Sequence, residues 1–276
     1  MGKVINFTKM TGAGNDFIVV NASEIKGLDA KQLTAKICDR TNGVGADGLL
    51  ILDKSSKADY KMRIINADGS EAEMCGNGAR CMVAYIIAQN NVHKKTLSMD
   101  TLAGIVEGEV QGDLIKVHLS DPKDYNANIA INVNDRKLKV SYIDTGVPHA
   151  VVYVDEINNI NVHDIGRIIR NHEHFKPRGT NVNFVEQLDR DLVAVRTYER
   201  GVEDETKACG TGSVASGIVT YLKANPSIHS KIGAKMNVRT KSGEILEVSF
   251  DIKNNKISNV WLKGSAKFVA RGEYYI

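Results

Sequence analysis

The chain has 276 residues, which suits one large domain or two of ordinary size and is ample to bury a core. It carries 36 basic and 33 acidic residues, for a formal net charge of +3, and the absence of a basic block argues against a nucleic-acid partner. The longest apolar run, residues 81–88, is far shorter than the roughly 20 residues of a membrane span, and the first residues lack the apolar run of a signal peptide. These features predict a soluble cytoplasmic protein, in which four cysteines form no disulfide framework.

The first half of the chain has mainly strand patterns, separated by glycine-containing turns. The predicted strands are residues 4–9, 16–20, 49–52, 61–66, 96–100, 105–110 and 114–119. Helical spacing over residues 28–40, with Asp29 as a candidate N-cap, predicts a first helix. A second helix is predicted directly after Cys75, and because residues 79–88 are apolar on nearly all faces it should be buried.

The second half repeats this order. Pro122 and the asparagine-rich residues 126–134 are predicted to be a crossing between the halves. The predicted strands that follow are residues 137–144, 150–154, 181–186, 192–197, 235–240, 245–251, 257–263 and 267 to the end. One helix is predicted over residues 162–171, and another follows Cys209 and ends near Asn225, because Pro226 cannot continue it.

A constant shift relates the two halves. Cys209 lies 134 residues after Cys75, the strand near residue 182 lies 133 after the strand at 49, and the helix near 162 lies 133 after Asp29. The shift indicates an internal duplication, and it is much longer than the roughly 20–50 residues of a solenoid repeat. The predicted fold is α+β, with two pseudo-symmetric lobes that each form a β-rich, barrel-like sheet around a central helix. Residues 1–121 with 264–276 are predicted to form the lobe of Cys75, and residues 122–263 the lobe of Cys209.

Two cysteines begin glycine-rich turns at predicted helix N-termini. Residues 66–81 read NADGSEAEMCGNGARC, and residues 199–215 read ERGVEDETKACGTGSVA. A helix N-terminus presents unpaired N–H groups and about half a positive charge, so it binds anions and favours a thiolate. If the halves are pseudo-symmetric, the two termini can face each other across one cleft. A carboxylate held between them would place its α-carbon between two sulfurs, which is the geometry of a two-base racemase.

Other interpretations of the cysteines remain open at this point. Cys38 and Cys81 are predicted to be core residues, and zinc binding by Cys75 and Cys81 is disfavoured by their spacing on a helix. A cysteine hydrolase or acyl-transferase would use Cys75 or Cys209 as nucleophile and His149 as base, and would leave one thiol idle. A non-catalytic binder of small carboxylates would use the helix N-termini but would need neither thiol.

The motifs resemble those of the diaminopimelate epimerases, a family of cofactor-independent amino-acid epimerases. The resemblance covers the whole chain and rests on the two cysteine motifs and on FTKMTGAGNDF at residues 7–17. It implies interconversion of LL- and meso-diaminopimelate, in lysine and cell-wall synthesis, with no pyridoxal phosphate and no metal. It also implies a small amino-acid substrate, no nucleic-acid or membrane partner, and a homodimer. A different amino acid as substrate is the open alternative within this class.

The same resemblance implies the roles of individual residues. Cys75 and Cys209 would be the base and the acid, and His149 and Glu199 would tune the thiols. Arg200 would grip the far carboxylate with two hydrogen bonds. The full set implied around the substrate is Asn15, Asn66, Gly76, Asn77, Asn181, Glu199, Arg200, Gly210 and Thr211. Two positions depart from some members, since Gly48 stands where those carry Gln and Val147 where they carry Asn. Each departure removes a polar contact to the far end of the substrate.

Overall fold

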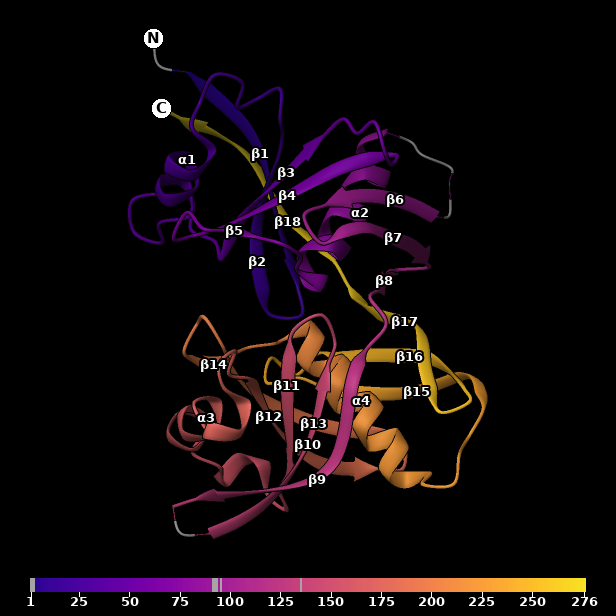
Figure 1. Cartoon of the computed structure of the whole chain (residues 1–276). Helices are drawn as coiled ribbons and strands as arrows, with labels where there is room; N and C mark the ends of the chain where they lie inside the picture. Colours follow the sequence, from indigo (N-terminus) through magenta and orange to yellow (C-terminus); the bar gives the residue numbers. More distant parts are fainter. Residues whose placement is uncertain (1–2, 91–93, 95, 135) are drawn as a thin grey trace. The chain divides into compact units, whose positions relative to one another are not determined.

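The computed structural model of the chain describes residues 3–90, 94, 96–134 and 136–276. It divides into two compact units (Figure 1). Unit 1 comprises Met1–His118 and Lys263–Ile276, and unit 2 comprises Leu119–Leu262. No helix in the described ranges has both the length and the apolar composition needed to cross a membrane.

Unit 1 is a curled sheet with two helices. Its elements are β1 (Val4–Gly12), β2 (Asn15–Asn21), α1 (Ala30–Ile37), β3 (Gly48–Asp53), β4 (Tyr60–Asn66), β5 (Glu71–Ala72), α2 (Gly76–Asn90), β6 (Thr96–Thr101), β7 (Gly104–Gln111), β8 (Leu114–Leu119) and β18 (Lys267–Tyr275). The strands pair in the order β18-β1-β2-β3-β4-β6-β7-β8. The pairs β2/β3 and β4/β6 are parallel, and the other pairs in this order are antiparallel.

Unit 2 is built in the same way. Its elements are β9 (Lys123–Val133), β10 (Arg136–Asp144), β11 (Pro148–Tyr153), the 3-10 helix η1 (Ile157–Asn159), α3 (Val162–Arg170), the 3-10 helix η2 (Glu173–Phe175), β12 (Asn181–Asp189), β13 (Leu192–Glu199), β14 (Asp204–Thr206), α4 (Gly210–Ala224), β15 (Lys231–Arg239), β16 (Ile245–Lys253) and β17 (Lys256–Ser265). The strands from β9 to β16 pair in the order β9-β10-β11-β12-β13-β15-β16. The parallel pairs are β11/β12 and β13/β15, at the positions equivalent to those in unit 1.

The duplication extends to side-chain contacts. Arg63 Nε lies 2.7 Å from Glu71 Oε1, and Arg196 Nε lies 2.7 Å from Glu205 Oε1. The two arginines are 133 residues apart and the two glutamates 134, the same shift that the sequence predicts. In both units the ion pair joins a strand to the short strand beside it, β4 to β5 and β13 to β14. The predicted duplicated α+β fold is confirmed.

Each unit encloses one fifteen-residue helix (Figure 1). Helix α2 packs on β1, β2, β3, β4 and β7, and α4 packs on the equivalent strands of unit 2 and on β15. Every residue of α4 from Gly212 to Thr220 is buried. Because strands contact the helix on several sides, its buried residues are not confined to one stripe. The predicted central helices are confirmed.

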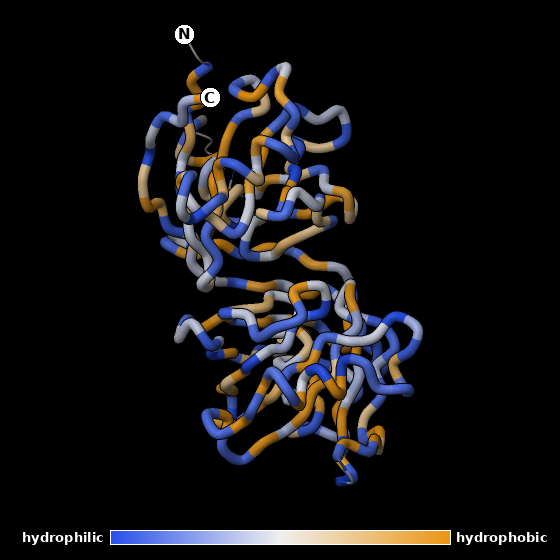
Figure 2. The backbone as a smooth tube through the Cα atoms, turned by 90° about the vertical axis from the view of Figure 1, so that its left-hand side faces the viewer, coloured by the Kyte–Doolittle hydropathy of each residue, from blue (hydrophilic) through white to orange (hydrophobic). Residues whose placement is uncertain are grey.

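The strand pattern follows the alternation expected of a sheet with one buried face. Along β16 the side chains alternate between buried and less buried positions, and the alternation of hydropathy can be followed along the chain in Figure 2. Each predicted strand coincides with an observed one to within a few residues. The first predicted helix is shorter than expected, but Asp29 caps it as predicted, accepting hydrogen bonds from the backbone N–H groups of Lys31 and Gln32.

The predicted crossing at residues 126–134 is wrong, because this segment belongs to strand β9, which pairs with β10. The asparagine-rich composition suggested a crossing between the halves, but Ile131 and Val133 are buried on one face of a strand. Asn128 has a positive φ of 60°, and the register with β10 shifts beside it. Asparagine tolerates that conformation, so the local asparagine enrichment supports a β-bulge in a strand.

The duplicated ion pairs give a matched test of stability. The side chains of Arg196 and Glu205 are 20% and 10% exposed, and Lys241 Nζ also lies 2.7 Å from Glu205 Oε2, whereas Arg63 and Glu71 are 34% and 22% exposed. Glu205→Ala leaves a partly buried guanidinium without its carboxylate and should reduce the free energy of unfolding of unit 2 by about 3 kcal/mol. Glu71→Ala should cost unit 1 about 1 kcal/mol. Urea denaturation of both variants measures the two losses, and equal losses would contradict this ranking.

Candidate active site

Cys209 is the N-cap residue of α4. Its backbone is extended (φ −118°, ψ 115°), and its carbonyl oxygen accepts hydrogen bonds from both the backbone N–H and the hydroxyl of Ser213, each at 2.9 Å. The thiol does not cap the helix, and its Sγ lies 3.5 Å from Thr211 Oγ1. The N–H groups of a first helical turn have no partner within the helix. Gly210 and Thr211 therefore offer backbone donors beside a buried thiol.

Glu199 lies at the end of β13 and contacts this thiol. Burial raises the pKa of the Glu199 carboxyl, and hydrogen bonds including one from the Cys209 side chain act in the opposite direction. A carboxylate in contact with a thiol can accept its proton, and a raised pKa makes the carboxylate a better acceptor near neutral pH. The arrangement would allow Glu199 to accept the proton of the Cys209 thiol.

Three neighbouring strands of unit 2 carry polar residues at one level of the sheet. His149 on β11 pairs with Asn181 on β12, and the next residue, Val182, pairs with Tyr198 on β13, which precedes Glu199. His149 is fully buried, and burial, followed by the positive charge of Arg200, lowers the pKa of its imidazole to about 3. His149 is therefore a neutral imidazole at physiological pH.

Asn181 and Arg200 are held together by the backbone. The Asn181 side chain donates to the carbonyl oxygen of Pro148 at 3.0 Å and accepts from the Arg200 N–H at 2.8 Å. The Arg200 guanidinium donates through Nη1 to the carbonyl oxygen of Arg178 at 3.0 Å. A guanidinium has five N–H donors, and this bond uses one of them. Other N–H groups of Arg200 can therefore donate to an acceptor from outside the chain.

Unit 1 carries the equivalent helix N-terminus at Cys75. Its carbonyl oxygen accepts from the Ala79 N–H at 2.8 Å, and its Sγ lies 3.5 Å from the Gly78 nitrogen. Cys75 is half-buried, whereas Cys209 is buried. Gly76 and Asn77 supply the first backbone N–H groups of α2, as Gly210 and Thr211 do for α4.

A polar network holds the side chain of Asn77 in place. Asn77 Nδ2 donates to Asn15 Oδ1 at 2.7 Å, and Asn15 Nδ2 donates to Asp47 Oδ2 at 2.9 Å. From the other side, the buried Arg80 donates to Asn77 Oδ1 at 2.8 Å. The first turn of α2 is thereby tied to the turn between β1 and β2 and to the end of the segment before β3.

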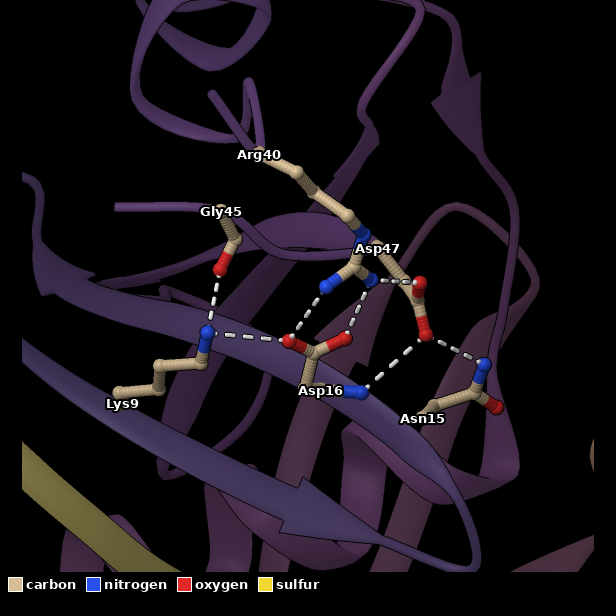
Figure 3. A network of polar contacts seen from close by, with 6 residues as sticks. All are labelled: Lys9, Asn15, Asp16, Arg40, Gly45 and Asp47. Atoms are coloured by element: carbon tan, nitrogen blue, oxygen red, sulfur yellow. Dashed lines mark hydrogen bonds and ion pairs between the residues drawn. The ribbon is translucent and has the colours of Figure 1, made fainter. Parts of the chain in front are cut away.

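Asp47 connects this network to a cluster of charges. Its carboxylate accepts from the Asp16 N–H at 3.1 Å and from Arg40 at 2.7 Å, and Arg40 also binds Asp16. Figure 3 shows these contacts, with the residues Lys9, Asn15, Asp16, Arg40, Gly45 and Asp47. Burial raises the pKa of the Asp16 carboxyl, but the contacts with Arg40 and Lys9 outweigh it and lower the pKa, so the Asp16 carboxylate stays ionised. Asn15 is thus positioned by Asp47, which is itself fixed by charged neighbours.

The corresponding level of unit 1 lacks titratable groups. Phe17 pairs with Gly48, and Gly48 pairs with Asn66, in the places that His149, Asn181 and Glu199 take in unit 2. A Cβ on Gly48 would stand 2.7 Å from the carbonyl oxygen of Ile65, so a side chain there needs a backbone shift. The two halves share one fold but differ in chemistry at this level.

The predicted site residues are therefore distributed between the two units. Within unit 1, Asn15, Gly76 and Asn77 lie at the N-terminus of α2 with Cys75, and the exposed Asn66 ends β4. Within unit 2, Thr211 and Glu199 contact Cys209 directly, and Asn181 contacts the backbone N–H of Arg200. In the described part of the chain, no three His, Cys, Asp or Glu side chains are grouped to hold a metal ion.

Two buried or networked residues escaped the sequence analysis. Asn183 contacts His149 and is fully buried, and Asp47 holds Asn15. Asn183 lies two residues after Asn181 on the same strand, so its position on the same face was a usable signal. Asp47 had no such signal, because its contacts with Asn15 and Asp16 join segments about thirty residues apart in sequence.

Comparison with known proteins identifies the family. A family model described as Diaminopimelate epimerase matches residues 7–123 and 141–269. The diaminopimelate epimerase of Aquifex aeolicus (strain VF5) is 40% identical over 280 residues, covering 97% of each chain. That of Hydrogenobaculum sp. (strain Y04AAS1) is 40% identical over 278 residues, covering 96% of each.

Solved structures with much lower identity share the fold. A phenazine biosynthesis protein of the PhzF family from Bacillus anthracis has a TM-score of 0.74 at 19% identity, covering 99% of this chain and all of that one. A hydroxyproline epimerase from Agrobacterium vitis has a TM-score of 0.71 at 14% identity, covering 99% and 91%. These structural similarities, at less than 20% identity, show the fold alone. The family model and the relatives at 40% identity show the family to which the chain belongs. The resemblance noted in the motifs is confirmed, and the chain belongs to the diaminopimelate epimerase family.

Proposed function

We propose that this protein interconverts LL- and meso-2,6-diaminopimelate with two cysteines acting as base and acid. The observation that supports the proposal is that two equivalent fifteen-residue helices each begin directly after a cysteine, in a chain of this family. A hydrolase or a carboxylate binder would need only one such helix. The two-base reaction uses both helix N-termini and both cysteines.

In the proposed reaction, one thiolate removes the α-proton and the other thiol returns a proton to the opposite face. The electron pair of the broken C–H bond is held on the substrate's carboxylate until the new C–H bond forms. The backbone N–H groups of Gly76–Asn77 and Gly210–Thr211 would bind that carboxylate, because they are the unpaired donors of two first turns. Glu199 would take the proton of Cys209 when this thiol serves as base.

Helix N-termini alone cannot supply the rate enhancement. Each contributes about 0.3–2 kcal/mol, while enzymes lower barriers by roughly 8–23 kcal/mol. The remainder must come from fixed positions and from donors held rigidly in a site that excludes water. The Asn77–Asn15–Asp47 network supports this requirement, because it fixes one helix N-terminus before any ligand arrives.

We propose that Arg200 recognises the far carboxylate of the substrate, and that Asn66 and Asn181 are among the residues that line the substrate. The guanidinium of Arg200 retains unused donors, and a carboxylate accepts two of them in parallel. Gly48 and Val147 contribute no polar side chain, so the ion pair between Arg200 and the far carboxylate carries more of the specificity in this chain.

We further propose a homodimer that acts in the cytoplasm and needs no pyridoxal phosphate. Exposed apolar side chains on β18, such as Phe268 and Val269, offer surface for a second copy.

Alanine variants of the two cysteines test the two-base mechanism. Cys75→Ala and Cys209→Ala should each abolish epimerisation in both directions, because one face of the α-carbon loses its acid or base. In heavy water, early product of the native protein should carry α-deuterium, and recovered substrate much less, as measured by mass spectrometry. Cys38→Ala serves as the control, since Cys38 is a buried core residue of unit 1. Near-native epimerisation by either helix-terminal variant would rule the mechanism out.

Arg200→Ala tests recognition of the far carboxylate. Loss of a charge-assisted hydrogen bond costs about 1.5–3 kcal/mol, so kcat/KM for diaminopimelate should fall roughly 10- to 150-fold. Arg190→Ala, in the exposed turn between β12 and β13, should leave it unchanged. Lysine lacks the far carboxylate and should be a poor substrate of the native protein. Equal turnover of lysine and diaminopimelate would favour a broader racemase instead.

Asp47→Asn tests the network behind Asn15 and Asn77. The substitution removes the negative charge of the carboxylate that accepts hydrogen bonds from Asn15 and Arg40. The first turn of α2 should then lose its fixed position. We expect kcat/KM to fall about 10- to 100-fold, in the range of one hydrogen bond to a charged group. Asp53→Asn, at the exposed end of β3, is the matched control. A steady-state assay that finds the two variants alike would exclude a positioning role for Asp47.

A further inference from the structure

His149 is a buried histidine with one satisfied and one unsatisfied ring nitrogen. Its Nδ1 lies 3.1 Å from Asn183 Nδ2, while its Nε2 is buried and has no hydrogen-bond partner among the residues that the structure describes. An unsatisfied buried polar atom destabilises the folded state, and such atoms are rare in native structures. The unsatisfied Nε2 of His149 therefore needs an explanation.

The contacts of Asn183 identify which atom of its side-chain amide is the nitrogen and which is the oxygen. Its Nδ2 lies 3.2 Å from the carbonyl oxygen of Ala150, which can only accept, and its Oδ1 accepts from the Thr197 hydroxyl at 3.0 Å. A flipped amide would set two oxygens against each other at Ala150. The nitrogen therefore points at Ala150 and at His149, and both of its N–H groups are used.

The tautomer of His149 follows from this orientation. Since Asn183 Nδ2 has only hydrogens to offer, His149 Nδ1 must accept, and in a neutral imidazole the single ring proton then resides on Nε2. The unsatisfied atom is thus an N–H donor. We propose that Asn183 is a positioning residue that locks His149 as a neutral Nε2–H imidazole, and that His149 serves the reaction as a hydrogen-bond donor to an anion and not as a proton acceptor.

Asn183, which contacts His149, packs against the helix N-terminus of unit 2. A Cβ on Gly212 would stand 2.4 Å from Asn183 Oδ1 and 3.3 Å from Cys209 Sγ, so the first turn of α4 lies directly on Asn183. The anions that the proposed function brings to such a place are a thiolate and the substrate carboxylate. This inference rests on the proposed function and assigns His149 a part in it.

The surrounding charges support the neutral form. Arg200 opposes a proton on His149 electrostatically, and Glu199, at the same level of the sheet, is engaged with Cys209. An imidazole that already carries its proton on Nε2, and whose Nδ1 is occupied, has no free lone pair with which to accept a thiol proton. It can stabilise an anion without exchanging a proton with it.

Nitrogen-15 NMR of histidine-labelled protein tests the tautomer without any assay of activity. The His149 signals, assigned by their loss in His149→Gln, should show a proton on Nε2 and none on Nδ1 from pH 5.5 to 9. In Asn183→Asp the new carboxylate should bring a proton to Nδ1. Thr197→Val is the control, because Ala150 still orients the amide and the native tautomer should persist. A protonated Nδ1 in the native protein would overturn the proposal even if Asn183→Asp fails to fold.

Two substitutions of His149 separate a donor from a base. Glutamine places an N–H group near the position of Nε2 but cannot take up a proton, whereas leucine provides neither. His149→Gln should keep kcat within about tenfold of the native value, and His149→Leu should lose roughly 10- to 150-fold, the range for one hydrogen bond to a charged group. Glutamine as inactive as leucine would show that His149 exchanges protons. A protein that retains the Nε2–H tautomer but epimerises nothing would refute the proposed function and the catalytic part of this inference, and leave only the role of Asn183.

The source of the anion is distinguished by the Nε2–H resonance. A shift on adding meso-diaminopimelate to the inactive Cys209→Ala protein would assign the bond to the substrate carboxylate. A pH-dependent shift in substrate-free protein that disappears in one of the two cysteine-to-alanine variants would assign it to that thiolate. A resonance that moves in neither experiment would refute the donor role.

Discussion

The structure depends on the burial of one apolar helix in each unit. Strands contact α2 and α4 on several sides, so most of their residues are buried and their positions are fixed by packing in several directions. A helix that is held in this way brings its N-terminal N–H groups to a fixed place, and these groups cannot all be satisfied within the helix. The position of the helix N-terminal N–H groups beside Cys75 and Cys209 is therefore a consequence of how each unit is packed.

The duplicated fold has been used for two different chemical environments. Both units keep the strand order, the parallel pairs and the ion pair between neighbouring strands. At the level next to the helix N-terminus, however, unit 1 has Phe17, Gly48 and Asn66, while unit 2 has His149, Asn181 and Glu199. The backbone geometry is shared, so the difference resides in three side chains per unit. Titratable groups are thus concentrated beside Cys209, and the first turn of α2 is instead held by a network of amides and charges.

Fixed polar groups recur around both helix N-termini. In unit 1 the chain of contacts runs from Arg40 through Asp47 and Asn15 to Asn77, and in unit 2 from Thr197 through Asn183 to His149. In each case an amide side chain uses both its donor and its acceptor, and so its orientation is determined. Such an arrangement holds donors where charge develops before a substrate arrives, which is the condition for electrostatic catalysis.

The sequence by itself determined the elements, the duplication and the two thiols. Strand alternation and the all-round apolar helices are local patterns, and the shift of 133–134 residues is visible wherever the halves are compared. Local composition misled at residues 126–134, because an asparagine can occupy a bulge in a strand as readily as a loop. Only the tertiary structure decided which side chains support the site. Asn183 contacts a histidine 34 residues away, and Asp47 contacts an asparagine 32 residues away, on other strands and turns. No local pattern encodes such contacts, since they arise from strand register and from the packing of each helix inside its sheet.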